Sequence, residues 1–474
     1  MADPTKPSQQ AAGQAAQAAS RIRPPSGTRD LYPDDMRRRR YVMDAWRRVS
    51  TRHGFDEVDG PTFETTELYT VKSGDGIIGE LFQAFSGKDP EQKAALQRGE
   101  PAPFAIRPEF TPSLARMYAA QARSLPKPCK WFMAGPFFRA ERPQRGRLRE
   151  FLQWNVDILG TPNEEDHAAK QEAEAIAVCV DLLRELGLTS KDIRIKLGAR
   201  QMVTRRLADI NYPAESTDQV IALLDARPKI GAEKYRERAR ELGLPDAMIA
   251  HFDPERREVV RLDLSPDQIA KMGGDAASYE QQFTTEGTLF RELDVLGLRE
   301  WCEFDNMVIR GLAYYTGTVF EAIADGERAV AGGGRYDGLV ELFGGPSTPA
   351  VGFAMGDVVL SLLLEDKGLM PAEAALLERT GGRPDVFVIP GGESTDTDVR
   401  RTVAMLRSAG LHARTTTKAT RNIGKLLKDA ASSHARFAVI LESATEATIK
   451  DMSTGEQDPA RTLVANLAHT IASR

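Results

Sequence analysis

The stretch that most constrains what this chain can fold into is FRAERPQRGRLREFLQWNVD, residues 138–157. From residue 152 onward apolar and polar side chains alternate, which is the pattern of a strand with one face in a core. An aromatic run precedes this stretch, and Pro143–Gly146 supplies turn residues. The sequence therefore predicts a β-hairpin, with Leu152, Trp154, Val156 and Ile158 on one face and Gln153, Asn155 and Asp157 on the other.

The predicted hairpin is also strongly basic. Five arginines fall within residues 139–149 of a chain whose formal net charge is −5, so the local charge indicates an anionic ligand. Gln153 and Asp157 lie about 13 Å apart along a strand that rises about 3.3 Å per residue, so a small cationic group could bind further down. The alternative is a surface hairpin whose arginines pair with nearby glutamates. The row of polar residues on the face opposite Trp154 disfavours this alternative, because a strand that is buried on both faces normally carries no such row.

Length and composition limit the class of protein. A chain of 474 residues predicts two or three domains, and 41% hydrophobic with 28% charged residues is typical of a soluble globular protein. The three cysteines are widely spaced, which supports neither a disulfide framework nor a metal site and indicates a reducing cytoplasm. No apolar run is long enough for a membrane span, and the six histidines lack metal-ligand spacing, so we expect neither a membrane segment nor a histidine-based catalyst or zinc site.

Helices and strands can be placed along the first half of the chain. Residues 1–25 are rich in Ala and Gln and are expected to be disordered, and a long helix should follow Pro33. Residues 104–117 read as a strand that runs into a helix, with Thr111 as the N-cap and Pro112 as the first helical residue. The charged, helical stretch 201–286 predicts an inserted subdomain or, alternatively, a solvated helical excursion.

Two glycine-containing motifs mark the second half. Residues 308–321 combine a buried-looking strand with Arg310 and two tyrosines, and residues 331–339 form a glycine-rich turn that lets the backbone approach a ligand. Residues 347–360 read as a strand followed by a helix. From residue 385 onward strands alternate with helices, which predicts a compact α/β domain.

At these residues the chain resembles a known family. The hairpin is similar to the second signature motif of class II aminoacyl-tRNA synthetases, in the form that histidyl-tRNA synthetases carry. Residues 308–321 and 331–339, in that order, closely match the two motifs peculiar to histidyl-tRNA synthetases. The helix after Pro33 and a proline at Pro61 resemble the first class II motif, and residues 347–360 fall where the third belongs.

The resemblance implies an α+β fold with four parts. A disordered extension (1–25) would precede a class II catalytic domain with an antiparallel sheet (26–365), which carries the helical insertion at about 201–286. A linker (366–384) would lead to an α/β anticodon-binding domain (385–474). The family also implies a homodimer whose interface is formed largely by the first motif, and an insertion that clasps the acceptor arm of tRNA.

The implied activity is that of a cytoplasmic histidine–tRNA ligase. L-histidine and ATP, with Mg²⁺, would form histidyl adenylate, and the acyl group would then pass to tRNA(His). Arg139 and Arg310 would be catalytic from opposite sides of the α-phosphate. The histidine-binding residues would be Glu109, Phe110, Thr111, Arg139, Gln153, Asp157, Arg310, Tyr314, Tyr315 and Tyr336. ATP would bind Arg139, Glu141 and Arg147, and Gln144 and Arg145 would read the extra 5′ guanosine of tRNA(His).

Departures from the family pattern at three positions leave alternatives open. Val359 stands where the third motif has its ATP-binding arginine, preceded by Val358 in place of an acidic residue, and Ala313 replaces an aspartate. These changes favour a non-catalytic paralogue that resembles the regulatory subunit of ATP phosphoribosyltransferase and binds histidine as a signal. The C-terminal domain and the intact tip arginines oppose that interpretation. A class II synthetase for proline, threonine or glycine would leave the segment from Arg310 to Tyr315 unexplained.

Overall fold

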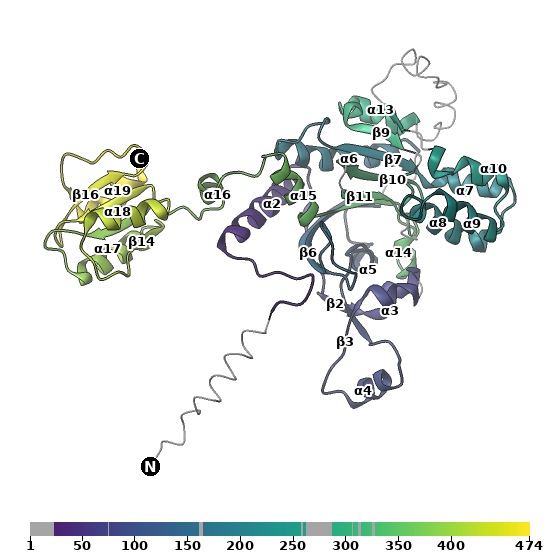
Figure 1. Ribbon diagram of the computed structural model, residues 1–474, viewed down its shortest axis with the longest axis horizontal. Coiled ribbons are helices and arrows are strands. Elements are labelled where there is room, and N and C mark those ends of the chain that lie inside the picture. Colours follow the sequence, from purple (N-terminus) through teal and green to yellow (C-terminus); the bar gives the residue numbers. More distant parts are fainter. Residues whose placement is uncertain are drawn as a thin grey trace. The chain divides into compact units, whose positions relative to one another are not determined.

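The chain forms two compact units (Figure 1). The structure is a computed structural model and describes residues 23–73, 75–160, 165–256, 259–261, 287–305, 307–310, 314–324 and 328–474. The large unit holds Val42–Leu369 and the residues up to Asp30, and the C-terminal unit holds Leu31–Tyr41 and Met370–Arg474. The basic hairpin and both glycine-containing motifs therefore belong to the large unit.

A nine-stranded sheet forms the centre of the large unit, in the order β1-β5-β6-β12-β11-β10-β7-β9-β8. Among its described pairs, β1 with β5 and β7 with β9 are parallel and the others are antiparallel. The sheet confirms the α+β class and its antiparallel core. Its strands are β1 Asp56–Glu57, β5 Cys129–Phe138, β6 Glu150–Leu159, β7 Arg194–Ala199, β8 Val259–Arg261, β9 Cys302–Asp305, β10 Thr318–Ile323, β11 Ala329–Arg335 and β12 Ala350–Gly356.

Strands β5 and β6 are the predicted hairpin. Their pairing runs from Cys129 opposite Leu159 to Phe138 opposite Glu150. As the alternation predicts, Trp154 is buried on one face, where its ring stacks on Trp46 of helix α2 (Pro33–Arg52) with the centroids 6.1 Å apart. The polar side chains of β6 lie on the opposite face and line a cavity. The register of this one strand thus separates the core from the site.

Helices cover both faces of this sheet (Figure 1). On the Trp154 face, α2 joins α6 (Glu165–Glu185) through an ion pair of 2.9 Å between Arg48 and Glu185, and α6 packs against α13 (Gly287–Val295). On the other face, α5 (Thr111–Gln121) and α14 (Leu339–Leu342) share a core with β5. Helix α15 (Asp357–Asp366) follows β12 directly, as predicted for residues 347–360.

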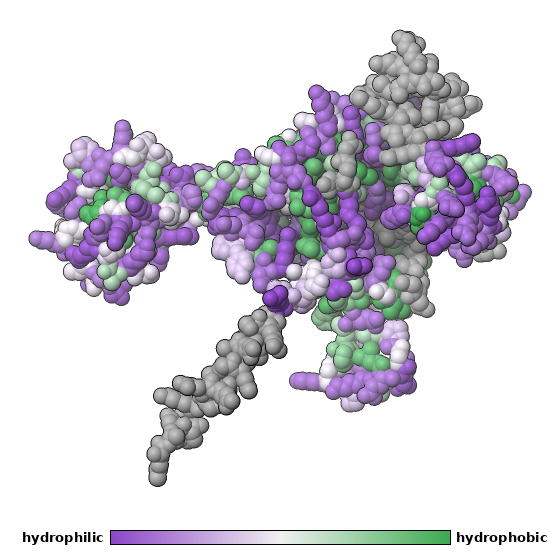
Figure 2. All heavy atoms as spheres, viewed as in Figure 1, coloured by the Kyte–Doolittle hydropathy of each residue, from purple (hydrophilic) through white to green (hydrophobic). Residues whose placement is uncertain are grey.

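A small three-stranded sheet, in the order β2-β4-β3, follows helix α2. Its strands are β2 Phe63–Thr65, β3 Phe82–Ala84 and β4 Phe104–Ile106, and helices α3 (Thr66–Ser73) and α4 (Pro90–Gln97) lie in its connections. Phe63 and Phe85 keep 58% and 48% of their surface exposed. The molecular surface in Figure 2 is mostly hydrophilic, with a hydrophobic area around α4 and β3. This region therefore exposes apolar side chains that its own core does not cover.

Helices occupy the described part of the expected insertion. They are α7 (Arg200–Asp209), α8 (Thr217–Ile230), α9 (Ala232–Glu241) and α10 (Asp246–His251), grouped beside the large sheet in Figure 1. They share a core that includes Val220, Leu224 and Tyr235, and Ile309 packs into it. Residues 262–286 lie outside the described chain. Because Ile309 precedes Arg310, the helical bundle is in contact with one of the predicted site segments.

The C-terminal unit has the predicted alternation of strands and helices. Its five-stranded sheet has the order β14-β13-β15-β16-β17 and mixes parallel and antiparallel pairs. The predicted linker 366–384 contains a short helix, α16 (Glu373–Arg379). The strands are β13 Val386–Pro390, β14 Ala413–Thr415, β15 Phe437–Leu441, β16 Glu446–Asp451 and β17 Thr462–Leu463, and the other helices are α17 Asp396–Ser408, α18 Ile423–Ser432 and α19 Leu467–Ala472.

Some local expectations need correction or lie outside the structure. Thr111 is not the N-cap of α5: Phe110 occupies that position without a side-chain hydrogen bond, and Thr111 is the first helical residue. Residues 307–310 are not a strand, and the strand of that motif begins at Thr318. The extension up to residue 22 and Ala313 are outside the described residues. Within the described chain, no helix combines the length and apolarity needed to cross a membrane.

Candidate active site

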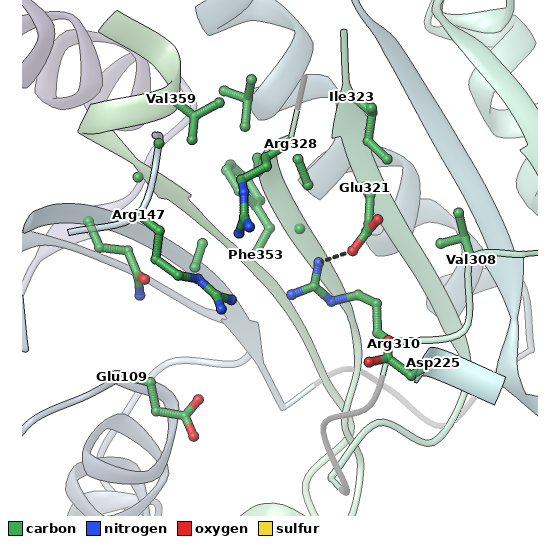
Figure 3. A pocket seen from close by; sticks show the side chains of 18 of the residues that line it. Glu109, Arg147, Asp225, Val308, Arg310, Glu321, Ile323, Arg328, Phe353 and Val359 are labelled. Atoms are coloured by element: carbon green, nitrogen blue, oxygen red, sulfur yellow. Dashed lines mark hydrogen bonds and ion pairs between the residues drawn. The ribbon is translucent and has the colours of Figure 1, made fainter. Parts of the chain in front are cut away.

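A cavity of about 900 Å³ lies over the polar face of β6. Strands β10, β11 and β12 supply its floor together with β6, and the start of α5, helix α8 and the first turn of α15 supply its walls. Figure 3 shows Glu109 on one side and Arg310, joined to Glu321, on the other, with Arg147 and Arg328 entering from further directions. The cavity therefore brings together carboxylates and guanidinium groups from segments far apart in the chain.

Asp157 is the most constrained carboxylate of the cavity. It is 2% exposed, and the Tyr336 hydroxyl donates a hydrogen bond of 2.5 Å to its Oδ1. Its Oδ2 has no hydrogen-bond partner among the described residues. Burial raises the pKa of Asp157 to about 7, against the lowering effect of the Tyr336 hydrogen bond. An unsatisfied, buried carboxylate oxygen that faces a cavity is suited to a ligand that donates a hydrogen bond.

A second carboxylate, Glu109, stands at the start of helix α5. The Tyr314 hydroxyl donates to Glu109 Oε2 at 2.8 Å. Burial raises the pKa of Glu109, while the Tyr314 hydrogen bond and the charges of Arg139 and Arg310 oppose that rise. Thr111, the first residue of α5, lines the cavity near Glu109.

Three tyrosines connect the two carboxylates. The ring centroid of Tyr314 lies 4.9 Å from that of Tyr315 and 5.9 Å from that of Tyr336. All three rings line the cavity and belong to the core that packs α5 against the sheet. They form an aromatic wall of fixed geometry between Glu109 and Asp157, which favours a flat ligand with polar groups at both ends.

An ion pair holds Arg310 in place, and Gly332 leaves the space that its guanidinium group occupies. Its Nη1 lies 2.9 Å from Glu321 Oε1, and its backbone is left-handed with φ at 53°. A Cβ on Gly332 would lie 1.5 Å from that nitrogen, so only glycine leaves room for the guanidinium. Within the glycine-rich segment 331–339, the three consecutive glycines therefore belong to strand β11, where Gly332 admits the side chain of Arg310, and the predicted turn is confined to residues 337–338.

Arg139 and Arg147 of the hairpin reach the same cavity. Arg139 Nε donates to the Pro108 carbonyl at 3.1 Å, and its Cζ lies 5.2 Å from the centre of the Phe151 ring. Arg147 Nε lies 2.9 Å from a carboxylate oxygen of Glu141, which also lines the cavity. Both guanidinium groups keep donors that an anion could use.

Not every predicted residue lies at the cavity. Glu109, Thr111, Arg139, Glu141, Arg147, Gln153, Asp157, Arg310, Tyr314, Tyr315 and Tyr336 line it. Phe110 is fully buried in the neighbouring core, and Gln144 and Arg145 are at the hairpin tip, where Arg145 pairs with Asp366 at 2.8 Å. Phe110 therefore packs beneath the site, whereas Gln144 and Arg145 make their contacts outside the cavity.

The cavity also contains residues that the sequence did not single out. Asp225 comes from α8 in the inserted helices, and Glu321 and Arg328 lie at β10 and just before β11. Glu321 could have been suspected as a polar residue in an apolar strand. Asp225 and Arg328 had no such signal, because charged residues are common in helices and loops. Val359 lines the cavity as a plain apolar residue. Within the described residues, no cluster of His, Cys, Asp or Glu is arranged to hold a metal ion.

The chain is similar to a protein family, to curated relatives and to solved structures. The family model for histidyl-tRNA synthetase matches residues 27–357. The histidine–tRNA ligases of Haloarcula marismortui and Opitutus terrae are 37% and 36% identical, covering 91% and 87% of this chain and 94% and 89% of their own. The solved histidyl-tRNA synthetase of Nostoc sp. PCC 7120 has the same fold, with a TM-score of 0.68 at 22% identity over 96% of this chain and 99% of the other.

The antiparallel sheet, the basic hairpin and the arginine-lined cavity define the catalytic fold of a class II aminoacyl-tRNA synthetase. The similarity to relatives extends beyond this fold into the C-terminal unit. The chain belongs to the histidyl-tRNA synthetase family.

The raised pKa of Asp157 predicts a pH-dependent stability change in Asp157→Asn. Its folded-state pKa of about 7 is above the ordinary 3.8, so the folded state holds the proton longer than the unfolded state does. Wild-type stability should therefore fall as pH rises from about 4 to 7. At pH 8 the neutral variant should be more stable by about 1–3 kcal/mol, and this gain should shrink towards pH 4.

Urea unfolding followed by tryptophan fluorescence measures this difference in the large unit, which contains all four tryptophans. The exposed Asp209→Asn is the matched control and should show no such pH dependence. An Asp157→Asn protein that is less stable than wild type at pH 8 would contradict a buried, destabilising charge.

Proposed function

We propose that the cavity activates L-histidine with ATP and transfers it to tRNA(His), the reaction of a histidine–tRNA ligase. The observation that carries this proposal is the buried Asp157 with its unsatisfied oxygen, facing a cavity that Arg310 enters from another side. It lies in a chain whose relatives named histidine–tRNA ligase match it over about nine-tenths of its length.

Histidine selection follows from the polar groups at the two ends of the tyrosine wall. Asp157 would accept a hydrogen bond from the imidazole, beside Tyr315 and with Tyr336 fixing the carboxylate. Glu109 and Thr111, with Tyr314 and Gln153, would hold the ammonium and carboxylate groups. A substrate without the ring N–H would leave Asp157 Oδ2 unpaired in a buried place, so such substrates should be rejected.

Activation needs positive charge around the α-phosphate. The histidine carboxylate attacks that phosphorus, the bond to the bridging oxygen breaks, and pyrophosphate leaves. Arg139 and Arg310 would stabilise the negative charge that gathers on the phosphoryl oxygens, since fixed guanidinium groups do so without reorganising. Arg147 and Glu141 would bind ATP on the hairpin side. Magnesium would enter as the complex with ATP, as is usual for triphosphate substrates.

The first test is histidine-dependent exchange of labelled pyrophosphate into ATP, run with and without magnesium. Arg310→Ala should lower kcat/KM by about 100- to 1,000-fold, because it removes transition-state charge stabilisation. Gly332→Ala should cause a similar loss, because its methyl group would occupy the position of Arg310 Nη1. Gly338→Ala is the matched control, since Gly338 has φ at −92° and no heavy atom near its would-be Cβ.

The outcome also separates two functions. A folded protein that binds histidine but supports no exchange would be the regulatory paralogue, a possibility raised by Val359 and Ala313. A solved protein from Bacillus halodurans C described as an ATP phosphoribosyltransferase regulatory subunit/histidyl-tRNA synthetase shares the fold with a TM-score of 0.63. At 20% identity that likeness concerns the fold alone, whereas the ligase relatives exceed 35%.

We further propose that the hairpin tip contacts the acceptor end of tRNA. Gln144 and Arg147 form a β-bridge that presents the tip, and the Arg145 side chain is 65% exposed. The double variant Gln144→Ala/Arg145→Ala should lower the kcat/KM of tRNA charging by about 10- to 100-fold, because it removes charge-assisted and base-edge hydrogen bonds. Pyrophosphate exchange should stay unchanged, because neither residue lines the cavity.

The same assay tests the reading of the extra 5′ guanosine. Wild-type protein should charge tRNA(His) transcripts that carry this nucleotide better than transcripts that lack it. Equal charging of the two transcripts would disprove base recognition at this position and leave the tip with a phosphate-binding role at most.

We also propose a homodimer in the cytoplasm. The dimer is supported by the similarity to the first class II motif and by the exposed Phe63 and Phe85 in the segment that follows it. Sedimentation velocity at micromolar concentration should give twice the chain mass of 52.1 kDa, and Phe63→Asp should shift the protein towards monomer because a charge would be buried. A wild-type protein that sediments as a monomer would refute the dimer.

A further inference from the structure

Near Val359, the cavity has a positively charged side chain, Arg328, which another part of the chain supplies. A Cβ built on Gly146 would lie 3.2 Å from Val359 Cγ2 and 3.6 Å from Arg328 Cδ. Val359 and the stem of Arg328 therefore flank one point, Gly146 in the loop that joins β5 to β6. Figure 3 shows the Arg328 side chain extending into the cavity on the side of Val359. We propose that Arg328 binds the polyphosphate of ATP and takes over the role that an arginine at position 359 would have.

The charges around Arg328 favour an anionic ligand. Gly146 is the chain neighbour of Arg147, so two guanidinium groups enter this part of the cavity, Arg147 from the β5–β6 loop and Arg328 from the residue just before β11. Arg147 has Glu141 as its partner, whereas no ion pair joins Arg328 to a carboxylate of the described residues. A bound polyphosphate would satisfy both cations and relieve their repulsion.

Helix α15 does not offer an alternative anion site at its first turn. Asp357 already fills that place: its Oδ1 accepts a hydrogen bond of 2.8 Å from the Leu152 amide, and its Oδ2 pairs with Arg29 at 3.1 Å. A phosphate there would meet a carboxylate that is 4% exposed. The next two residues, Val358 and Val359, line the cavity without charge. The positive charge for this wall must therefore come from outside α15, and Arg328 is the residue that the geometry places there.

This inference rests on the proposed function and names one more ATP-binding residue for it. In the exchange assay, Arg328→Ala should raise the KM for ATP by about 10- to 100-fold, the usual effect of removing a hydrogen-bonded charge from its partner. The KM for histidine should change by less than about twofold, because only interactions with ATP are lost. Arg328→Lys should fall between wild type and Arg328→Ala, because lysine keeps the charge and loses the paired donors.

The double variant Arg328→Ala/Val359→Arg tests the location. If both positions serve the same phosphate group, the new arginine should restore part of the lost ATP affinity. Arg123→Ala is the matched control, an exposed arginine outside the cavity. Thermal unfolding of each variant checks that the large unit is intact.

Each result decides a separate question. An Arg328→Ala protein whose KM for ATP equals that of Arg123→Ala would overturn the inference, and a double variant without recovery would overturn the shared location. If wild type lacks histidine-dependent exchange, the proposed function fails instead. Equilibrium dialysis with labelled ATP then still tests Arg328, because weaker binding by Arg328→Ala would support its role and unchanged binding would refute it.

Discussion

The site depends on one buried carboxylate that its own surroundings do not fully satisfy. Asp157 lies on a strand between β5 and β12 and is 2% exposed, and Tyr336 satisfies one of its oxygens. Burial opposes its ionisation and raises its pKa to about 7, so the ionised carboxylate is unfavourable for folding. A ligand that donates a hydrogen bond to the second oxygen removes that penalty. Binding selectivity and reduced stability of the free protein thus have the same physical origin.

Glycines on the neighbouring strands make this arrangement possible. Gly352 lies opposite Asp157 in the β6–β12 register, and a Cβ there would come within 2.0 Å of Asp157 Oδ1. Gly332 on β11 leaves the space that Arg310 occupies. In both cases an ionisable side chain lies across the glycine of another strand, and any larger residue at the glycine position would block it. The glycines of β11 and β12 therefore position charges, and their main contribution is space for the groups that a ligand meets.

Much of this site could be predicted from the sequence because it follows strand periodicity. The alternation after residue 152 correctly separated Trp154 from Asp157, and the distribution of helices and strands in the C-terminal unit matched closely. Thr111 was misplaced by one residue, because propensity favours threonine at an N-cap and cannot see that Phe110 takes that position. Asp225 and Arg328 were missed for a different reason: the tertiary fold brings helix α8 and the residue just before β11 to the cavity, and no local pattern encodes that.

The valine at position 359 shows why motif position and site geometry must be considered separately. The stabilisation of a transition state or a polyphosphate depends on where the positive charge lies and on the geometry of its hydrogen-bond donors. It does not depend on which segment of the chain supplies them. Val359 removes a cation from the first turn of α15, while Asp357 brings a carboxylate into that turn and fixes it to Leu152 and Arg29. These two changes make the helix end unsuitable for phosphate. Because Arg328 reaches the same wall from just before β11, the cavity keeps its cationic side although the third motif has no arginine.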